Sequence, residues 1–258
     1  MYAKKSLGQN FLKSEKALNQ IVEAGRLSSS DTVLEIGPGL GALTSWLLYS
    51  GAKVIGVEKD DDLTIKLREM FVSEIKTGQL TLMNEDILDF EPKLDKYKLI
   101  ANIPYNITGA ILEKFLSCDK QPELIVILVQ KEVALRIVSR DEKESILSIS
   151  IKIYGEPKLV DTVKAGSFSP APKVDSAILA IYGISKSFFE ENKVTEEHFF
   201  KILKSGFASK RKKLSSNLSV SFDKAKVLEA FENLGLSENT RAEDVRLEVW
   251  KELSLKLS

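Results

Sequence analysis

The chain has 258 residues, of which 43% are hydrophobic and 29% charged, and its 37 basic and 37 acidic side chains cancel. These proportions are those of an ordinary globular protein, and the length accommodates a larger domain with a smaller one attached. No apolar run is long enough to span a bilayer, and no apolar stretch of a signal peptide follows the basic N-terminus. We therefore expect a protein of the cytoplasm with no membrane partner.

Cysteine and histidine are nearly absent from the sequence. Cys118 is the only cysteine, which excludes an internal disulfide and a cysteine-cluster metal site. His198 is the only histidine and stands where a helix is expected to begin, so we interpret it as structural. We expect no metal, and a reaction whose reagent is already activated, because no imidazole relay can be built.

Short apolar runs alternate with helix-like segments over the first half of the chain. The expected strands are Val33–Ile36, Val54–Val57, Leu80–Met83, Leu99–Ala101 and Leu124–Val129. The expected helices between and after them are Ala42–Tyr49, Asp61–Ile75, Thr108–Leu116 and Lys131–Ser139. This alternation predicts an α/β fold with right-handed crossovers and a mostly parallel sheet covered on both faces.

The pattern changes toward the C-terminus. Two further strands are expected at Lys158–Val163 and Ser176–Ile184. After them only helical spacing remains, at Phe199–Phe207, Lys212–Leu218, Lys224–Leu234 and Ala242–Leu257. The sequence therefore predicts a domain of residues 1–184 followed by an all-helical domain of residues 185–258.

The expected helical domain carries 14 basic and 12 acidic side chains, and its densest charge run is Lys210–Lys213. Such runs are usually solvated surface. Nucleic-acid binding is the functional alternative, because cations gathered on one segment can contact phosphates.

A glycine-rich turn follows the first expected strand. Gly37, Gly39 and Gly41 stand between that strand and the next helix, where glycine permits positive φ and lets a ligand approach the main chain. Glu58, at the end of the next strand, is well placed to accept hydrogen bonds from both hydroxyls of a ribose. This spacing also fits the looser dinucleotide fingerprint, which leaves a nicotinamide cofactor as an alternative.

Two details favour S-adenosylmethionine as the cofactor. Glu35, just before the first glycine, could receive the amino-acid part of that ligand or its neighbouring backbone, and Pro38 stiffens the turn in a way that suits a ligand without a pyrophosphate. A further acidic pair, Glu85 and Asp86, follows the third expected strand, where a carboxylate can take the amino group of the cofactor's adenine.

The segment after the fourth expected strand, Asn102–Ile107, indicates the chemistry. An aromatic exocyclic amine is a poor nucleophile because its lone pair is delocalised into the ring. The amide oxygen of Asn102 and the carbonyl of Ile103 or Pro104 can each accept one amine hydrogen, which directs the nitrogen lone pair at a sulfonium methyl. Tyr105 offers a flat face on which a flipped base can stack. No general base is needed before transfer.

With these motifs the sequence resembles a known family, the bacterial ribosomal RNA small-subunit adenine dimethyltransferases (kasugamycin-sensitivity dimethyladenosine transferases), over nearly the whole chain. The matching blocks are Lys5–Leu12, Leu34–Thr44, Val57–Glu58, Glu85–Asp86, Asn102–Tyr105, Val129–Ala134, Phe168–Ala177, Gly206–Leu214 and Arg241–Glu243. In departures from the family, Ile103 replaces the more usual leucine, and Lys210 and Lys212 stand near where paired arginines are frequent.

The resemblance implies a Rossmann-like class I methyltransferase domain with a mostly parallel seven-stranded sheet, and a smaller C-terminal all-helical domain that recognises RNA. The residues that it implies for cofactor binding are Asn10, Leu12, Gly37, Gly39, Glu58, Asp86 and Asn102. Those that it implies for handling the adenine are Asn102, Pro104, Tyr105 and Phe168.

The resemblance also implies the reaction and the partners. The expected reaction is N6,N6-dimethylation of two adjacent adenines near the 3′ end of small-subunit ribosomal RNA during ribosome assembly. The expected partners are ribosomal RNA and a precursor of the small subunit, and the enzyme is expected to be a monomer.

Three alternatives stay open. The first is a macrolide-resistance-type adenine methyltransferase of large-subunit ribosomal RNA, which shares the motif blocks; the loop Pro170–Ser176 and the tail Arg241–Glu243 favour the small-subunit substrate. The second is a non-catalytic assembly factor with the same fold, against which the intact Asn102–Tyr105 segment argues. The third, a nicotinamide oxidoreductase, leaves that segment unexplained.

Overall fold

The computed structural model describes residues 9–139 and 142–257, which form two compact units. The first unit comprises the described part of Met1–Ala134 together with Glu156–Ile184, and the second comprises Leu135–Gly155 together with Ser185–Ser258. A boundary therefore falls at Ile184, as expected. The expectation that all of residues 1–184 belong to one domain needs a correction, because segment 135–155 groups with the helices of the second unit.

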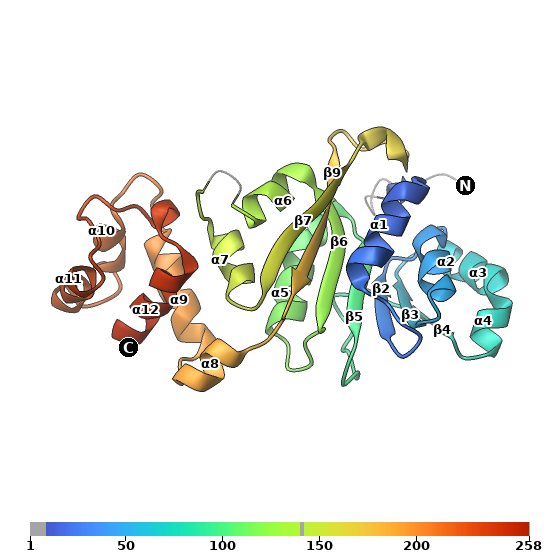
Figure 1. The fold of residues 1–258 in the computed structure, drawn as a ribbon, viewed down its shortest axis with the longest axis horizontal. Helices are drawn as coiled ribbons and strands as arrows, with labels where there is room; N and C mark the ends of the chain where they lie inside the picture. Colours follow the sequence, from blue (N-terminus) through green and yellow to red (C-terminus); the bar gives the residue numbers. More distant parts are fainter. Residues whose placement is uncertain (1–8, 140–141, 258) are drawn as a thin grey trace. The chain divides into compact units, whose positions relative to one another are not determined.

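A seven-stranded sheet forms the centre of the first unit, in the order β4-β3-β2-β5-β6-β9-β7 (Figure 1). Its strands are β2 (Thr32–Ile36), β3 (Lys53–Glu58), β4 (Leu80–Asn84), β5 (Lys98–Asn102), β6 (Leu124–Gln130), β7 (Glu156–Val163) and β9 (Ser176–Tyr182). The strands from β4 to β6 run parallel, whereas β9 is antiparallel to both β6 and β7. The mostly parallel seven-stranded sheet implied by the resemblance is confirmed.

The order of the strands reverses direction beside β2. From β2 the chain passes outward through β3 to β4 and then returns to pair β5 with the other edge of β2. Connections therefore leave the carboxyl ends of β2 and β5 in opposite directions and open a crevice between them, which is where open α/β sheets bind ligands.

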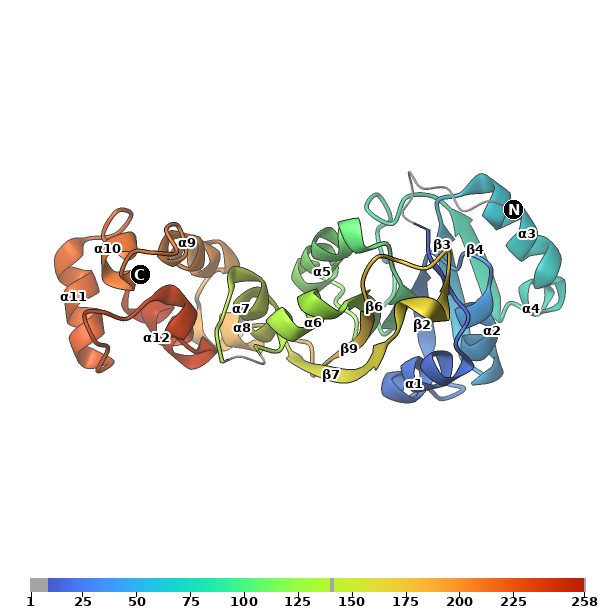
Figure 2. The ribbon, with the colours of Figure 1, turned by 90° about the horizontal axis from the view of Figure 1, so that it is seen from above.

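Alternate residues of the central strands serve opposite faces of the sheet. The helices of this unit are α1 (Glu15–Gly25), α2 (Ala42–Tyr49), α3 (Asp61–Met70), α4 (Val72–Lys76), α5 (Thr108–Ser117) and the start of α6 (Lys131–Ile137). Val33 and Ile100 join the core beneath α1 and α2, and the buried neighbours Leu34 and Leu99 point to the other face, which α5 covers (Figure 2). A sheet that lies between two layers of helices requires apolar residues on both faces, so successive residues of its strands are buried on alternate sides.

Helix α1 and a short two-stranded sheet were not anticipated from the sequence. The Ser14 side chain accepts the amide N–H of Ala17 at 3.3 Å and so starts α1, whose Leu18 and Ile21 enter the core. Strand β1 (Phe11–Leu12) pairs antiparallel with β8 (Phe168–Ser169), far away in the sequence. This pairing brings the N-terminal segment to the ligand-binding edge of the large sheet.

Two helices expected as single elements are divided. The expected helix Asp61–Ile75 breaks at Phe71, whose buried ring packs so close to Gly41 that a Cβ there would lie 2.7 Å from it. The expected helix Ala242–Leu257 separates into a 3-10 turn at Ala242–Asp244 and α12 (Leu247–Lys256). Between them the Val245 carbonyl accepts the indole N–H of buried Trp250 at 3.0 Å.

The second unit is helical and has its own apolar core. Its further helices are α7 (Ile146–Lys152), α8 (Ser187–Asn192), α9 (Glu196–Gly206), α10 (Leu214–Leu218) and α11 (Lys224–Asn233). Trp250 of α12, Leu203 of α9 and Leu218 of α10 are fully buried there. No helix of residues 9–139 and 142–257 combines the length and apolarity that crossing a membrane requires.

Specific contacts explain why segment 135–155 belongs to the helical unit. Lys143 forms an ion pair with Asp244, and the amide N–H of Glu144 donates to the carbonyl of Glu243 at 2.8 Å. The Tyr154 hydroxyl donates to Glu196 of α9, and its ring contacts Phe189 of α8. The tail motif Arg241–Glu243 therefore helps to hold segment 135–155 in the second unit.

The packing around Gly206 yields a stability prediction. A Cβ at this residue would lie 2.5 Å from the Trp250 ring and 2.8 Å from a methyl of Leu214, both buried. Gly206→Ala should therefore lower the free energy of unfolding by about 1–3 kcal/mol, the usual effect of overpacking. Urea titration followed by tryptophan fluorescence measures the change. Gly109→Ala in α5, where a Cβ meets nothing within 4 Å, is the control and should lose no stability. Equal stability of the two variants would contradict the packing.

Candidate active site

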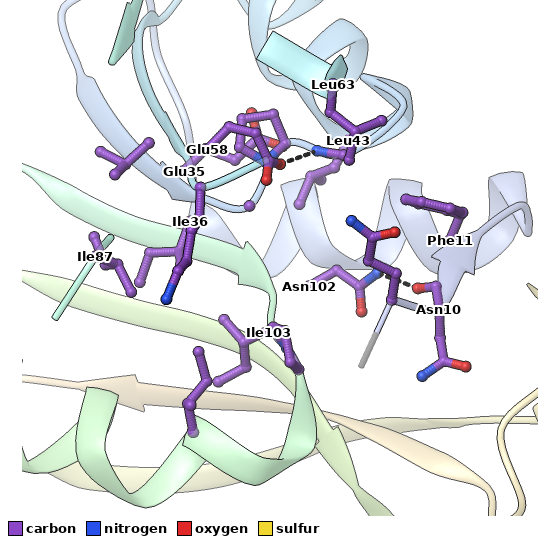
Figure 3. A pocket seen from close by; sticks show the side chains of 18 of the residues that line it. Asn10, Phe11, Glu35, Ile36, Leu43, Glu58, Leu63, Ile87, Asn102 and Ile103 are labelled. Carbon is purple, nitrogen blue, oxygen red and sulfur yellow. Dashed lines mark hydrogen bonds between the residues drawn. The ribbon is translucent and has the colours of Figure 1, made fainter. Parts of the chain in front are cut away.

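The carboxyl ends of β2 and β5 open onto a cavity of about 220 Å³ (Figure 3). Its lining comes from the N-terminal segment, the glycine turn after β2, the end of β3, and the turns after β4 and β5. These elements all belong to the first unit. The cavity lies at the strand-order reversal, so the predicted ligand-binding position and the observed cavity coincide.

The glycine turn has the conformation that the sequence predicts. Gly37, Gly39 and Gly41 all have positive φ, at 62°, 63° and 78°. A Cβ at Gly37 would meet nothing within 4 Å, so this residue leaves open space beside the cavity wall. A Cβ at Gly39 would lie 3.1 Å from the Phe11 ring, so that glycine allows the N-terminal segment to pack on the turn.

Glu58 reaches the cavity from the end of β3. Its Oε2 accepts the amide N–H of Gly39 at 3.0 Å, and its Oε1 accepts that of Asp60 at 2.9 Å. Burial raises the pKa of the Glu58 carboxyl, and these backbone hydrogen bonds oppose the shift. A carboxylate has about four acceptor positions, so Glu58 can still accept from the ribose hydroxyls expected here.

Glu35 is a buried acid in the wall of the cavity. It is 1% exposed, and neither its Oε2 nor the hydroxyl of neighbouring Thr44 has a hydrogen-bond partner in the described structure. Burial raises the pKa of Glu35 to about 8; the neighbouring Thr44 hydroxyl opposes this shift and the negative charge of Glu58 adds to it. A buried oxygen without a partner at the edge of a cavity is where a ligand's donor group would be held.

Asp86 lines the cavity in the turn after β4. Its Oδ2 accepts a hydrogen bond from Lys59 Nζ at 2.6 Å, and its Oδ1 accepts the amide N–H of Leu88 at 2.9 Å. The Lys59 ammonium is the main cause that lowers the pKa of Asp86. The carboxylate is therefore ionised and fixed in place, which suits the predicted acceptor for an adenine amino group.

The N-terminal segment bridges the cavity. Gln9 donates to Asp60 at 3.0 Å, on the side of β3, while the carbonyl of Asn10 accepts from Asn102 at the end of β5 (Figure 3). Leu12 is buried where β1 pairs with β8. The structure thus brings Asn10 and Leu12 to the cavity wall, as the resemblance implies; residues 5–8 of the same motif lie outside the described residues.

Asn102 is the last residue of β5, and its amide has one defined orientation. The Nδ2 donates to the Asn10 carbonyl at 3.0 Å (Figure 3). An amide that donates from its nitrogen to a carbonyl presents its oxygen to the other side. Asn102 lines the cavity, and its oxygen accepts no hydrogen bond from the described residues, so it remains available as an acceptor.

Pro104 and Tyr105 continue the cavity wall. Pro104 has φ −58° and ψ 133° and leads into the 3-10 turn η2 (Tyr105–Ile107), in which the Pro104 carbonyl accepts the amide N–H of Ile107 at 3.3 Å. The Tyr105 hydroxyl is hydrogen-bonded to Ser176 Oγ at 2.6 Å. Burial raises the pKa of the Tyr105 phenol, so the hydroxyl stays protonated.

Phe168 is the one predicted site residue that lies outside the cavity lining. It is 4% exposed and belongs to the core cluster, opposite Leu12 in the β1–β8 pair. A base can stack on this ring only if the ring becomes uncovered. The structure therefore brings Tyr105 to the cavity but leaves Phe168 behind its wall.

No group of histidine, cysteine and carboxylate side chains suited to a metal ion occurs among the described residues. His198 lies in α9 of the second unit, where its Nε2 contacts the carbonyl of Ser254 at 3.2 Å. This is the structural role that the sequence predicts for it.

The buried acid Glu35 yields a prediction about pH. Its carboxyl has a pKa of about 8 in the folded protein and an ordinary value of 4.5 when unfolded. Between these values the folded state holds a proton that the unfolded chain has lost. The stabilisation from this group is therefore complete below the unfolded pKa and is lost as the pH rises through the folded one.

Glu35→Gln keeps the shape of the side chain but cannot ionise. It should therefore reduce the fall in unfolding free energy between about pH 5 and about pH 8, which is at most about 1.4 kcal/mol per pH unit for one group. Urea midpoints across this range measure the effect. Glu69→Gln, an exposed acid of α3, is the control and should follow the wild type. Parallel curves for Glu35→Gln and wild type would contradict the buried, protonated state.

The chain is also similar to known proteins over nearly its whole length. Residues 1–257 match the family described as "Ribosomal RNA adenine dimethylase". Ribosomal RNA small subunit methyltransferase A of Dehalococcoides mccartyi (strain CBDB1) is 41% identical, over 98% of this chain and 88% of its own.

Two solved structures share the fold over nearly the full length. A dimethyladenosine transferase from Plasmodium falciparum aligns with a TM-score of 0.80 and 27% identity, over 94% of this chain and 95% of that one. The 23S rRNA methyltransferase ErmE aligns with a TM-score of 0.77 and 26% identity, over 96% of this chain and 99% of that one. With a family match over residues 1–257 and a relative that is 41% identical, the chain belongs to the ribosomal RNA adenine dimethylase family.

Proposed function

We propose that this protein uses S-adenosylmethionine to dimethylate the exocyclic amine of two adjacent adenines near the 3′ end of small-subunit ribosomal RNA. Family membership supports the class of reaction. The observation that carries the proposal is the fixed amide of Asn102, which presents its oxygen at the edge of the cavity beneath the glycine turn.

The cavity fits the cofactor on the side of β2 and β3. Open space at Gly37 admits a ligand to the main chain, and the partnerless oxygen of Glu35 can receive a donor of the amino-acid part. Glu58 can accept the ribose hydroxyls and Asp86 the adenine amino group. When bound, S-adenosylmethionine supplies a methyl group on a positively charged sulfur, which is already activated for transfer.

On the side of β5 the protein activates the exocyclic amine of the adenine by accepting hydrogen bonds from its two N–H groups. The Asn102 oxygen accepts one of these hydrogen bonds. The carbonyl of Pro104 already accepts the amide N–H of Ile107 at 3.3 Å and keeps one lone pair, so we assign the second acceptor first to the carbonyl of Ile103, with Pro104 as the alternative. Two fixed acceptors draw the nitrogen toward tetrahedral geometry and raise its nucleophilicity, and they cost no reorganisation during transfer. The proton released afterwards can pass to water.

Base stacking in this proposal begins with Tyr105. The ring lies at the cavity edge beside Asn102 and can support a flipped adenine. The predicted second stacking face, Phe168, requires β8 to uncover a ring that is 4% exposed. We therefore give Tyr105 the main stacking role and make the contribution of Phe168 conditional on that movement.

The small-subunit substrate is favoured over the large-subunit alternative. Identity is 41% to a small-subunit methyltransferase and 26% to the 23S rRNA methyltransferase. We expect a monomer, as the family resemblance implies. We expect the enzyme to act in the cytoplasm on a precursor of the small subunit.

The second unit supplies a candidate RNA contact. The run Lys210–Lys213 forms an exposed turn before α10, which corrects the expectation that it lies on a helix. Buried Asn217 holds this turn, because its Nδ2 donates to the carbonyls of Gly206 at 2.7 Å and Ser209 at 3.0 Å. None of the four cations pairs with a carboxylate within the described residues, so their charge is available for phosphates.

Asn102→Ala tests the proposed chemistry. The variant should retain most of the affinity for S-adenosylmethionine, measured by calorimetry, while the single-turnover rate of methyl transfer to unmethylated small subunits falls by more than about tenfold. Asn19→Ala, in α1 and outside the cavity lining, is the control and should keep the wild-type rate. A smaller loss in Asn102→Ala would refute amine positioning by this residue.

Mapping the methylated nucleotides by mass spectrometry assigns the substrate. Dimethylation of two adjacent adenines near the 3′ end of small-subunit RNA is the expected result. Methylation of large-subunit RNA instead would establish the alternative substrate, and wild-type protein that transfers no methyl group to either RNA would establish a non-catalytic role.

Replacing Lys210, Arg211 and Lys213 by glutamine tests the RNA contact. The slope of log affinity against log salt should become shallower by about 0.7–0.9 for each phosphate that the turn no longer neutralises. The affinity for S-adenosylmethionine should stay constant, because the cavity belongs to the first unit. The control replaces Lys193, Lys224 and Lys256, three exposed lysines of the same unit. An unchanged slope in the first variant, or an equal change in the control, would show that the turn has no specific role.

A further inference from the structure

Ser176 is a buried polar residue to which the proposed chemistry assigns no role. It opens strand β9, opposite Gln130 of β6 and Val163 of β7, and is 0% exposed. A strand with a hydrogen-bonded neighbour on each side has little freedom to shift. The Ser176 hydroxyl is therefore a fixed point in the sheet.

The strand end that carries Ser176 is held by a second set of contacts. The Asp175 carboxylate accepts the amide N–H of Ala165 at 3.0 Å and a hydrogen bond from Lys164 at 2.9 Å. The Asp175 carbonyl accepts the amide N–H of Lys131 at 3.0 Å. These contacts come from the segments before β8 and after β6, so the start of β9 is fixed from both sides.

The Ser176 hydroxyl bonds the Tyr105 hydroxyl at 2.6 Å, across 71 positions of sequence. Tyr105 begins a 3-10 turn of three residues, which is a weak support for a large side chain. Without a partner at its far end, the ring would sample other rotamers about its two side-chain torsions. With it, the ring is held at its Cβ by the turn and at its hydroxyl by the sheet.

We propose that Ser176 is a positioning residue that holds the Tyr105 ring at the edge of the cavity, ready for the target adenine. This inference rests on the proposed function, in which Tyr105 stacks on the flipped base. Stacking of a base in one orientation requires a ring that is already ordered, because ordering it at each turnover would cost free energy in the transition state. The raised pKa of Tyr105 is consistent with a protonated hydroxyl that keeps this hydrogen bond across the neutral pH range.

A double-mutant cycle tests the pair. Ser176→Ala and Tyr105→Phe each remove the same hydrogen bond and should each lower kcat by about threefold to tenfold, with the affinity for S-adenosylmethionine unchanged. The double variant should be no slower than the slower single variant, because the bond can be broken only once. Tyr105→Ala, which also removes the stacking face, should be slower than Tyr105→Phe.

Ser254→Ala is the matched control, since Ser254 is also 0% exposed but bonds a backbone carbonyl of its own helix in the second unit. It should keep the wild-type kcat. A Ser176→Ala variant with wild-type kcat would overturn the proposal, and so would additive effects in the double variant. If Ser176→Ala does not fold, Tyr105→Phe decides alone: a reduced kcat supports the bond and an unchanged kcat overturns it.

Ring dynamics give a readout that needs no methyl transfer. In protein labelled on its six tyrosine rings, the Tyr105 signals are those that disappear in Tyr105→Phe. Ser176→Ala should speed up the flipping of this ring, measured by NMR exchange, and leave the other rings unchanged. If the wild type transfers no methyl group, the proposed function is wrong. The proposed positioning of the Tyr105 ring by Ser176 is still tested by this measurement, because ring flipping does not depend on methyl transfer. Equal flipping rates with and without the Ser176 hydroxyl would overturn it.

Discussion

The site depends on one topological constraint, the meeting of the carboxyl ends of β2 and β5 at the point where the strand order reverses. β2 supplies the glycine turn and β5 supplies Asn102, and the two strands pair directly. Because paired parallel strands end at the same edge, the turn proposed to bind the cofactor and the turn proposed to bind the base are neighbours. The other residues that line the cavity come from the N-terminal segment, the end of β3 and the turn after β4.

Long-range hydrogen bonds then fix the functional groups in orientation. The carbonyl of Asn10 orients the Asn102 amide, and Ser176 holds the Tyr105 hydroxyl. In each case a group on a weakly constrained segment is tied to one on a strand. Preorganisation of this kind lowers a barrier only if the donors and acceptors are in place before the substrate arrives, which is the role that we propose for these two hydrogen bonds.

The chain crosses between the two units three times, after Ala134, Gly155 and Ile184, and this affects how the role of the second unit is understood. Segment 135–155 leaves α6, contributes α7 to the helical core and returns to β7. Its anchors include the backbone of Glu243 and the side chain of Asp244. The tail block Arg241–Glu243 therefore has a structural role. In the turn Lys210–Lys213 the backbone of Lys213 caps α10, whereas the four side chains form no ion pair within the described residues.

The sequence alone determined the strands of the large sheet, most helices, the glycine turn and the Asn102–Tyr105 segment. Their signals are local, since burial on both faces produces short apolar runs and a strand-to-turn junction requires glycine or proline. Every predicted site residue except Phe168 lines the cavity. Their roles in binding and transfer are proposals that the experiments above test.

Only the tertiary structure decided the features that join residues far apart in the chain. The Asn10–Asn102 and Tyr105–Ser176 bonds span 92 and 71 positions, and nothing in the local pattern specifies such partners. The raised pKa of Glu35 arises from its burial and from the negative charge of Glu58, which lies on another strand. The break at Phe71 and the burial of Phe168 likewise depend on what packs against them. The local sequence pattern shows which face of a helix or strand is apolar. Which other element packs against that face depends on the order of the strands in the sheet.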